Sequence, residues 1–116
     1  MTVRQRQPRM KDEKHLKFVR QLPCVVCGND IETEAAHVRA ADPSIGKLNS
    51  GIGAKPDDCF VLPLCGEHHR SQHKYGDEIE WWQIMRVDPI KVALRLYSVT
   101  GDVLQGEHVV GHARQR

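Results

Sequence analysis

Side chains that can bind metal are concentrated in one ten-residue stretch, residues 64–73. It contains Cys65 and the histidines His68, His69 and His73. Thiolate and imidazole are ligands that zinc prefers in proteins. The stretch therefore predicts metal binding, and the other reactive residues of the chain are interpreted as its partners.

Two further thiolates come from a C-x2-C pair upstream. The spacing of Cys24 and Cys27 lets both sulfurs reach one tetrahedral ion, and Gly28 supplies the conformational freedom that the turn needs. Cys65 and His68 repeat this spacing as C-x2-H. We expect these four donors to close one structural zinc site.

Two alternatives remain open for these ligands. A redox pair of the thioredoxin type at Cys24 and Cys27 would need a strand before it and a helix after it, but Asn29-Asp30 predicts a turn. A single zinc on the two cysteines with His69 and His73 would resemble a C2H2 finger. Fingers separate the two pairs by about twelve residues, and the gap in this chain is far longer.

His69 and His73 have i, i+4 spacing, so a helix places them on one face. His68 lies about 100° away from His69 around such a helix and points elsewhere. The helix would thus present His68 to the structural zinc and the other two histidines to a second, open metal site. His37, near the end of a predicted strand, could stand opposite that second site.

A small α+β fold is expected to position these residues. The hydrophobic pattern and the breaking residues predict a helix over 11–20, strands over 33–39 and 59–64, and helices over 66–75, 78–85 and 89–100. Asp88 is the expected N-cap before Pro89. Trp81 and Trp82 are expected in the core, and Cys59 is expected to be an ordinary buried residue.

Composition and charge narrow the class of protein. The chain has 116 residues, 5% aromatic residues, a mean hydropathy of −0.52 and a net charge of +2. A chain this small and polar has a modest apolar core, which metal or disulfides would help to stabilise. No signal segment or membrane span is recognised, so a cytoplasmic location is expected, in which thiols stay reduced and favour metal.

The two ends of the chain and one loop are expected to lie outside the packed elements. Residues 1–13 are predicted to be a disordered basic arm that attracts nucleic acid, with a solvated tail as the alternative. Residues 14–102 would form the domain, and 103–116 a loose tail. The long loop over 42–56 carries Lys47 and Lys55, which could contact phosphate; a plain connection is the alternative.

Together these motifs resemble the HNH, or ββα-metal, nuclease superfamily. The resemblance is carried by the following segments: Cys24-Val-Val-Cys27, Ala36-His37-Val38, Leu62-Pro63-Leu64-Cys65, His68-His69 and His73. More narrowly, residues 22–28, 35–39, 55–58 and 63–69 look like the phage recombination-enhancement (Ref) nucleases and their prophage relatives. The match covers about residues 14–100.

The resemblance implies a small zinc-stapled ββα-metal core with additional packing helices. It further implies a metal-dependent DNA endonuclease, phage or prophage encoded and linked to recombination. His37 would be the general base, since an imidazole with a pKa of about 6.5 can act near neutral pH. His69 and His73 would hold a divalent ion (Mg²⁺, Mn²⁺ or Zn²⁺) that stabilises charge on the scissile phosphate. The structural zinc would contribute on the order of 10 kcal/mol to folding.

The resemblance also implies DNA contacts by Arg39, Lys47 and Lys55, and a recombinase filament as a further partner. Many family members carry Asp or His just before the catalytic histidine, where this chain has Ala36, and the middle Asn of the HNH name is missing. Asp57 or Asp58 would substitute, as a ligand or in orienting His37, and we assign Asp58 as catalytic. The alternative is a zinc-stabilised DNA-binding or recombination accessory module without hydrolytic activity.

Overall fold

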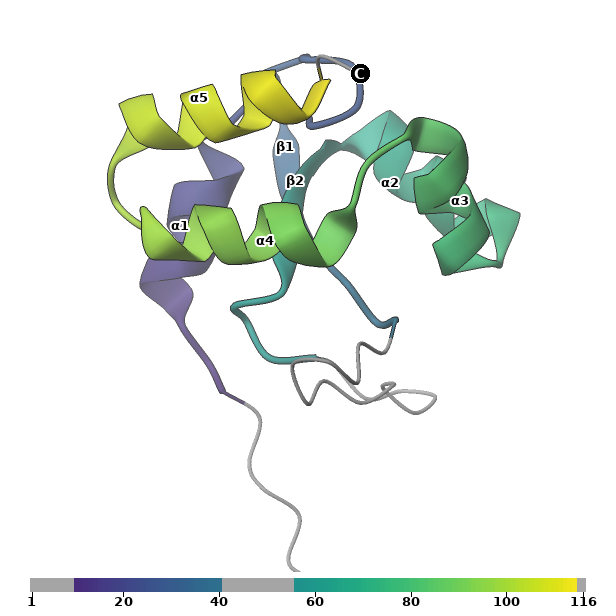
Figure 1. Ribbon diagram of the computed structural model, residues 1–116, viewed down its shortest axis with the longest axis horizontal. Coiled ribbons are helices and arrows are strands. Elements are labelled where there is room, and N and C mark those ends of the chain that lie inside the picture. Colours follow the sequence, from purple (N-terminus) through teal and green to yellow (C-terminus); the bar gives the residue numbers. More distant parts are fainter. Residues whose placement is uncertain (1–9, 41–55, 115–116) are drawn as a thin grey trace, which may run out of the picture.

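A computed structural model describes residues 10–40 and 56–114. Within these ranges the chain forms five helices and one two-stranded sheet (Figure 1), so the expected α+β class is confirmed. In chain order the elements are α1 (Glu13–Arg20), β1 (Thr33–His37), β2 (Val61–Cys65), α2 (Gly66–Tyr75), α3 (Glu78–Met85), α4 (Pro89–Ser98) and α5 (Val103–Arg114). Lys47, Lys55 and residues 1–9 of the basic arm lie outside the described residues.

The two strands pair antiparallel, from Thr33 opposite Cys65 to His37 opposite Val61. Pro63 is tolerated in β2 because β2 pairs with β1 alone among the described residues. The other edge of β2 forms no strand pairing, so the missing N–H of proline costs no hydrogen bond there. The Pro63 carbonyl accepts a hydrogen bond from the Val25 amide at 2.9 Å. The loop that contains the C-x2-C pair is thereby fixed to β2.

Local signals explain where the helices begin and end. Asp12, Asp77 and Asp88 are N-caps whose carboxylates accept backbone N–H bonds from the first turns of α1, α3 and α4. The predicted cap at Asp88 is therefore confirmed. Gly76 ends α2 with a φ of +91°, a conformation that side chains with a Cβ rarely adopt.

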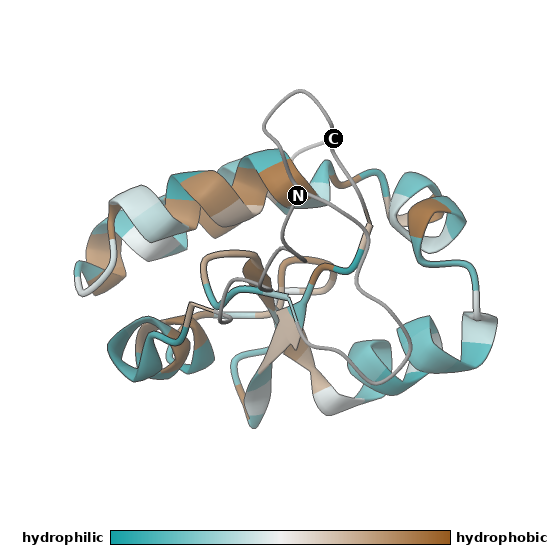
Figure 2. Cartoon of the chain, turned by 90° about the horizontal axis from the view of Figure 1, so that it is seen from below, coloured by the Kyte–Doolittle hydropathy of each residue, from teal (hydrophilic) through white to brown (hydrophobic). Residues whose placement is uncertain are grey.

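The hydrophobic core lies between the sheet and the helices that cover it. All five residues of β2 are buried, as are Thr33 and Ala36 of β1, and hydrophobic residues lie in bands along the helices (Figure 2). Trp81 and Trp82 are 1% exposed, which confirms their predicted place in the core. The Trp81 indole donates to Ser71 Oγ and the Trp82 indole to Glu78, so both buried N–H groups are satisfied.

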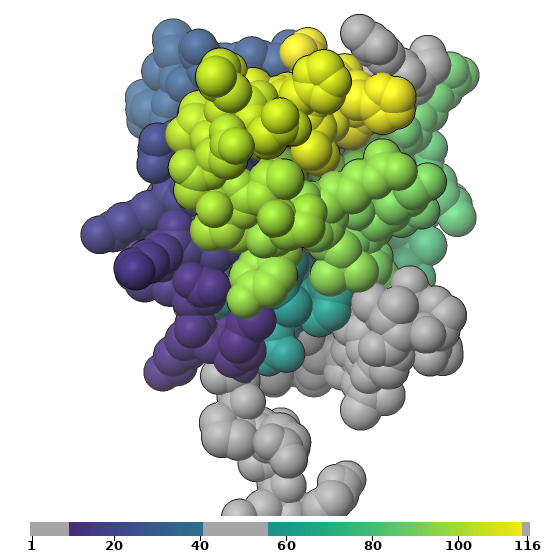
Figure 3. Space-filling model, turned by 60° about the vertical axis from the view of Figure 1, so that its left-hand side comes forward, coloured from purple at the N-terminus to yellow at the C-terminus, as the bar shows by residue number. Residues whose placement is uncertain are grey.

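The prediction of a loose tail over 103–116 is wrong for residues 103–114, which form α5. Asp102 accepts the Gln105 amide at 3.1 Å at the start of this helix. Gly106 and Val110 are buried, and α5 packs against α1 and α4 (Figure 3). The buried side of α5 covers Phe18 and Leu22 of the core, and this packing stabilises the helix.

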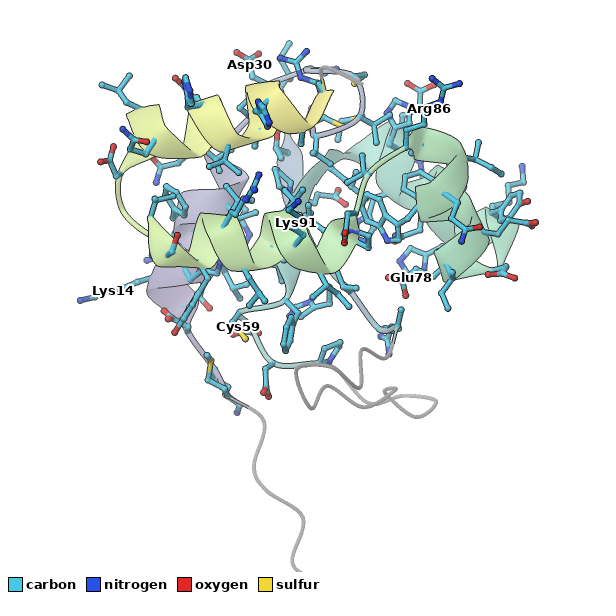
Figure 4. All side chains as sticks on the ribbon, viewed as in Figure 1. Lys14, Asp30, Cys59, Glu78, Arg86 and Lys91 are labelled. Carbon is cyan, nitrogen blue, oxygen red and sulfur yellow. The ribbon has the colours of Figure 1, made fainter. Side chains whose placement is uncertain are left out.

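Three smaller differences concern the strands and Cys59. β1 ends at His37 rather than at residue 39, and β2 begins at Val61 rather than at residue 59. Cys59 is half-buried rather than buried, and it lies in the loop before β2 (Figure 4). No helix among the described residues is long and apolar enough to cross a membrane.

Candidate functional site

The loop after α1 holds two cysteines in a tight turn. The Gly28 amide donates to the Cys24 carbonyl at 2.8 Å, and the Cys24 amide donates to the Asn29 carbonyl at 2.8 Å. Gly28 has a φ of +80°, so the sequence expectation of a permissive residue at this place is confirmed. The Val26 amide points at the Cys24 sulfur, 3.4 Å away, a contact that stabilises a thiolate.

Four donors from two parts of the chain meet at this turn. Cys24 and Cys27 come from the loop, Cys65 ends β2, and His68 lies in the first turn of α2. Their ligand atoms all lie within 4.8 Å of one another. β2 runs directly into α2, so one strand-to-helix junction delivers both Cys65 and His68 to the cysteine turn.

The spacing of these donor atoms matches a tetrahedral zinc site. Bonds of about 2.3 Å to sulfur and 2.05 Å to nitrogen place sulfur atoms about 3.8 Å apart and sulfur and nitrogen about 3.6 Å apart. Cys27 Sγ and Cys65 Sγ are 3.8 Å apart, and His68 Nδ1 lies 3.2 Å from Cys65 Sγ and 3.9 Å from Cys24 Sγ. The cluster could therefore hold a metal such as zinc.

The two loop thiols differ in their tendency to ionise. Burial raises the pKa of Cys27 to about 11, and hydrogen bonding and charge at Cys24 add to the effect. Burial also opposes ionisation of Cys24, but the backbone amides of Cys27, Cys65 and Val26 outweigh it and lower its pKa. Thiolates this close together repel one another, and a bound cation would offset that repulsion.

The structure decides between the two arrangements that the sequence leaves open for the zinc ligands. His68, and neither His69 nor His73, joins the three cysteines. The arrangement that resembles a C2H2 finger is therefore wrong.

His37 and Asp58 form a second pair of chemically active groups. His37 Nε2 lies 2.9 Å from Asp58 Oδ1, with side-chain exposures of 18% and 3%. An ionised carboxylate only accepts hydrogen bonds, so this contact puts the proton on Nε2 and makes Nδ1 the nitrogen that can accept one. The two residues assigned as catalytic from the sequence therefore lie in contact.

Asp58 is in turn held by the segment before α1. Its Oδ2 accepts the Asp12 amide at 2.8 Å, and its own amide donates to the Met10 carbonyl at 2.9 Å. Asp57 Oδ1 accepts the Met10 amide at 2.8 Å. We call this set of three hydrogen bonds, between residues 10–12 and 57–58, the N-terminal clamp. It fixes the carboxylate that orients His37.

His69 and His73 are neighbours on α2, as their spacing predicts, with ring centroids 4.9 Å apart. His69 Nδ1 lies 2.6 Å from Oε1 of Glu34 on β1. Among the described residues, the Cys3His cluster is the only group of three or more His, Cys, Asp or Glu donors at metal-binding spacing, so His37 does not complete a second one with them.

Of the proposed DNA contacts, the structure describes Arg39 alone. Its backbone amide donates to both carboxylate oxygens of Glu78, at 3.1 and 3.2 Å, and its side chain is half-buried. Figure 4 shows Glu78 at the start of α3, beside the end of β1. Glu78 thus connects Arg39, two residues after β1, to α3, the helix that carries the two tryptophans.

Three carboxylates in these arrangements were not singled out in the sequence: Glu34, Glu78 and Asp12. A signal existed for two of them. Asp12 precedes a helical pattern as an N-cap does, and Glu34 stands two residues before Ala36, on the same strand face as the missing acidic residue.

Comparison with known proteins gives a family. Residues 2–89 match the family model described as "Protein of unknown function (DUF968)". The "Uncharacterized protein YdfU" of Escherichia coli (strain K12) is 37% identical over 78 residues, which are 59% of this chain and 20% of YdfU. The aligned part is thus about a fifth of that relative's length, and no solved structure matches. Since the family model covers more than half of its residues, this chain belongs to the DUF968 family.

Proposed function

We propose that this chain is a metal-dependent DNA endonuclease of the HNH type, stabilised by a structural zinc on Cys24, Cys27, Cys65 and His68. The observation that carries the proposal is the hydrogen bond between His37 Nε2 and the buried Asp58 carboxylate. A histidine oriented by a carboxylate is a suitable general base for activating water. The antiparallel strands followed directly by α2 supply the ββα order that such a site needs.

Each residue has a distinct part in the proposed reaction. His37 accepts the proton of the attacking water, and Asp58 stabilises the imidazolium that forms. His69 and His73 hold a divalent ion, which when bound stabilises negative charge on the scissile phosphate and the leaving oxygen. Arg39, two residues after the end of β1, contributes positive charge for the phosphate backbone.

A nicking assay tests the proposal directly. Purified zinc-loaded protein is incubated with supercoiled plasmid and single-stranded DNA, with Mg²⁺ or Mn²⁺, in the presence and absence of a recombinase filament. We expect His37→Ala to reduce cleavage about 10²- to 10⁴-fold, the usual contribution of a general base. His108→Ala is the matched control, because His108 is exposed on α5, far along the chain from the site.

Asp58→Asn tests the hydrogen bond separately. The amide oxygen can still accept from the Asp12 amide, but the NH2 group then faces His37 Nε2 and favours the tautomer with the proton on Nδ1. We expect cleavage to fall while the zinc content and melting temperature change little. Cleavage by His37→Ala at the wild-type rate would refute the proposal.

The second candidate is a zinc-stabilised DNA-binding or recombination accessory module without hydrolytic activity. It is favoured by Ala36, which replaces an acidic ligand with a fully buried methyl group. The same samples decide between the two candidates. DNA binding by gel shift, with no metal-dependent cleavage under any of the conditions, would support the accessory module and exclude the nuclease.

A further inference from the structure

Glu34 and His69 make a contact between β1 and α2 that the proposed reaction does not use. Glu34 Oε1 lies 2.6 Å from His69 Nδ1. An ionised carboxylate only accepts, so His69 carries its proton on Nδ1 and keeps a lone pair on Nε2. Free neutral imidazole favours the opposite tautomer, with the proton on Nε2. The contact therefore selects the form in which Nε2 can bind a metal.

The backbone around α2 has room for this carboxylate. A Cβ on Gly66, the first residue of α2, would lie 3.6 Å from Glu34 Oε2 and 3.1 Å from Arg70 Nη1. The carboxylate thus lies at the N-terminal end of the helix, where the helix dipole favours negative charge. Because Gly66 has no Cβ, the space beside it is left to the Glu34 carboxylate and the Arg70 guanidinium.

The neighbouring histidine supplies the second donor. His73 follows one turn after His69 on α2, with ring centroids 4.9 Å apart. Histidines at i and i+4 on one helix face form a two-point metal site in several protein families. The His69 side chain is 23% exposed and His73 is exposed, so an ion in solution can reach both rings.

We propose that Glu34 is the positioning carboxylate of a divalent-metal site on His69 and His73. This inference rests on the proposed function for the assignment of the two histidines to an ion. Glu34 acts through His69: it fixes the ring orientation and the tautomer, and it raises the basicity of Nε2. Loss of such a carboxylate typically weakens metal binding 10- to 100-fold. Its charge also stands on the strand face where Ala36 supplies none.

Cobalt binding to the full chain tests the proposal. The protein is first loaded with one equivalent of zinc, which occupies the thiolate cluster, and Co²⁺ is then titrated by calorimetry. We expect one Co²⁺ to bind, with affinity about 10- to 100-fold lower in Glu34→Ala and lost in His73→Ala. Glu67→Ala is the control, because it removes the same charge from the first turn of α2 without touching His69; its affinity should stay close to that of the wild type.

The tautomer provides a second readout that a merely structural role would not change. Nitrogen-15 NMR of the zinc-loaded protein should show His69 with its proton on Nδ1, and Glu34→Ala should move it toward Nε2. Glu34→Gln should keep the Nδ1 proton, because the amide oxygen still accepts, and should bind Co²⁺ with intermediate affinity. Glu34 is 52% exposed at its side chain, so these variants are expected to fold, which retained zinc and circular dichroism confirm.

Two results would overturn the inference: unchanged Co²⁺ affinity in Glu34→Ala, or a wild-type His69 with its proton on Nε2. Neither measurement uses DNA. A protein that binds Co²⁺ as expected but never cuts DNA would contradict the nuclease proposal and leave this inference in place. A protein that cuts DNA while Glu34→Ala binds Co²⁺ normally would contradict this inference alone.

Discussion

Gly106 lies where α5 packs against Phe18 of α1 and Leu22 just after it, and replacing it with alanine tests that packing. A Cβ at Gly106 would lie 2.8 Å from Phe18 Cζ and 2.9 Å from Leu22 Cδ2. Carbon atoms in good contact are about 3.5–4.0 Å apart. Phe18 and Leu22 are 2% and 0% exposed, so they have little room to move away. Gly106→Ala must therefore displace α5 or force these two side chains out of their rotamers.

The expected magnitude follows from two opposing terms. Overpacking a close contact costs about 1–3 kcal/mol, and alanine gains up to about 1 kcal/mol over glycine inside a helix. Gly111, on the same helix, provides the control, because a Cβ there would meet nothing within 4 Å. Both variants share the helix-propensity gain, so Gly106→Ala should be less stable than Gly111→Ala by about 1–3 kcal/mol, the packing term alone.

Urea unfolding of the zinc-loaded protein measures this difference. Circular dichroism follows the helices, and the fluorescence of the buried Trp81 and Trp82 follows the core. The free energies of unfolding are comparable if both variants keep the wild-type m-value. Gly111→Ala should unfold at a higher urea concentration than the wild type.

Equal stability of the two variants would refute this reasoning, because the close approach of α5 to α1 would then be absent in solution. A higher stability of Gly106→Ala than of Gly111→Ala would refute it as well.

Two further predictions concern metal and pH. Cys65→Ser should lose the bound zinc and most of the folding free energy that the ion supplies, on the order of 10 kcal/mol. Cys59→Ser, outside the cluster, should keep both. Metal analysis and thermal unfolding measure the two effects, and a folded, zinc-containing Cys65→Ser protein would exclude the assignment of Cys65 as a zinc ligand. Burial lowers the pKa of His15 from 6.5, although Asp12 and Asp58 oppose the shift. The unfolded chain therefore takes up this proton first, so the free energy of unfolding should fall as the pH drops below about 6.5 toward the lowered value. His15→Leu should flatten this slope in urea unfolding, and equal slopes in the two proteins would contradict the prediction.

Features encoded in short segments were predictable from the sequence. The Asp88-Pro89 start of α4 and the bounds of α3 follow from capping rules and hydrophobic spacing that act within a few residues. The Cys3His cluster was also predictable, although its halves are distant in the chain. The C-x2-C and C-x2-H spacings each mark a ligand pair, and tetrahedral zinc requires two such pairs.

Features that depend on residues distant in the chain were not predictable from the sequence. The sequence did not predict α5 because Gly106 and Gly111 weaken the local helical signal. The reason for Gly106 lies in Phe18 on α1 and in Leu22, which follows that helix. The contact between Glu34 and His69 spans 35 positions, and both residues look like ordinary surface residues in their own segments. Neither arrangement leaves a local pattern that sequence reasoning can use.

The N-terminal clamp has a consequence for the smallest fragment that can serve in any of these experiments. A chain shortened to begin at Lys14 would keep every strand and nearly all of α1. It would nevertheless lose all three hydrogen bonds that residues 10–12 make with Asp57 and Asp58, together with the Asp12 cap of α1. The carboxylate that orients His37 would then lose the backbone hydrogen bond that the Asp12 amide donates to its Oδ2. A fragment for mutagenesis or for transfer into another protein should therefore retain residues 10–12 as well as the strands and helices.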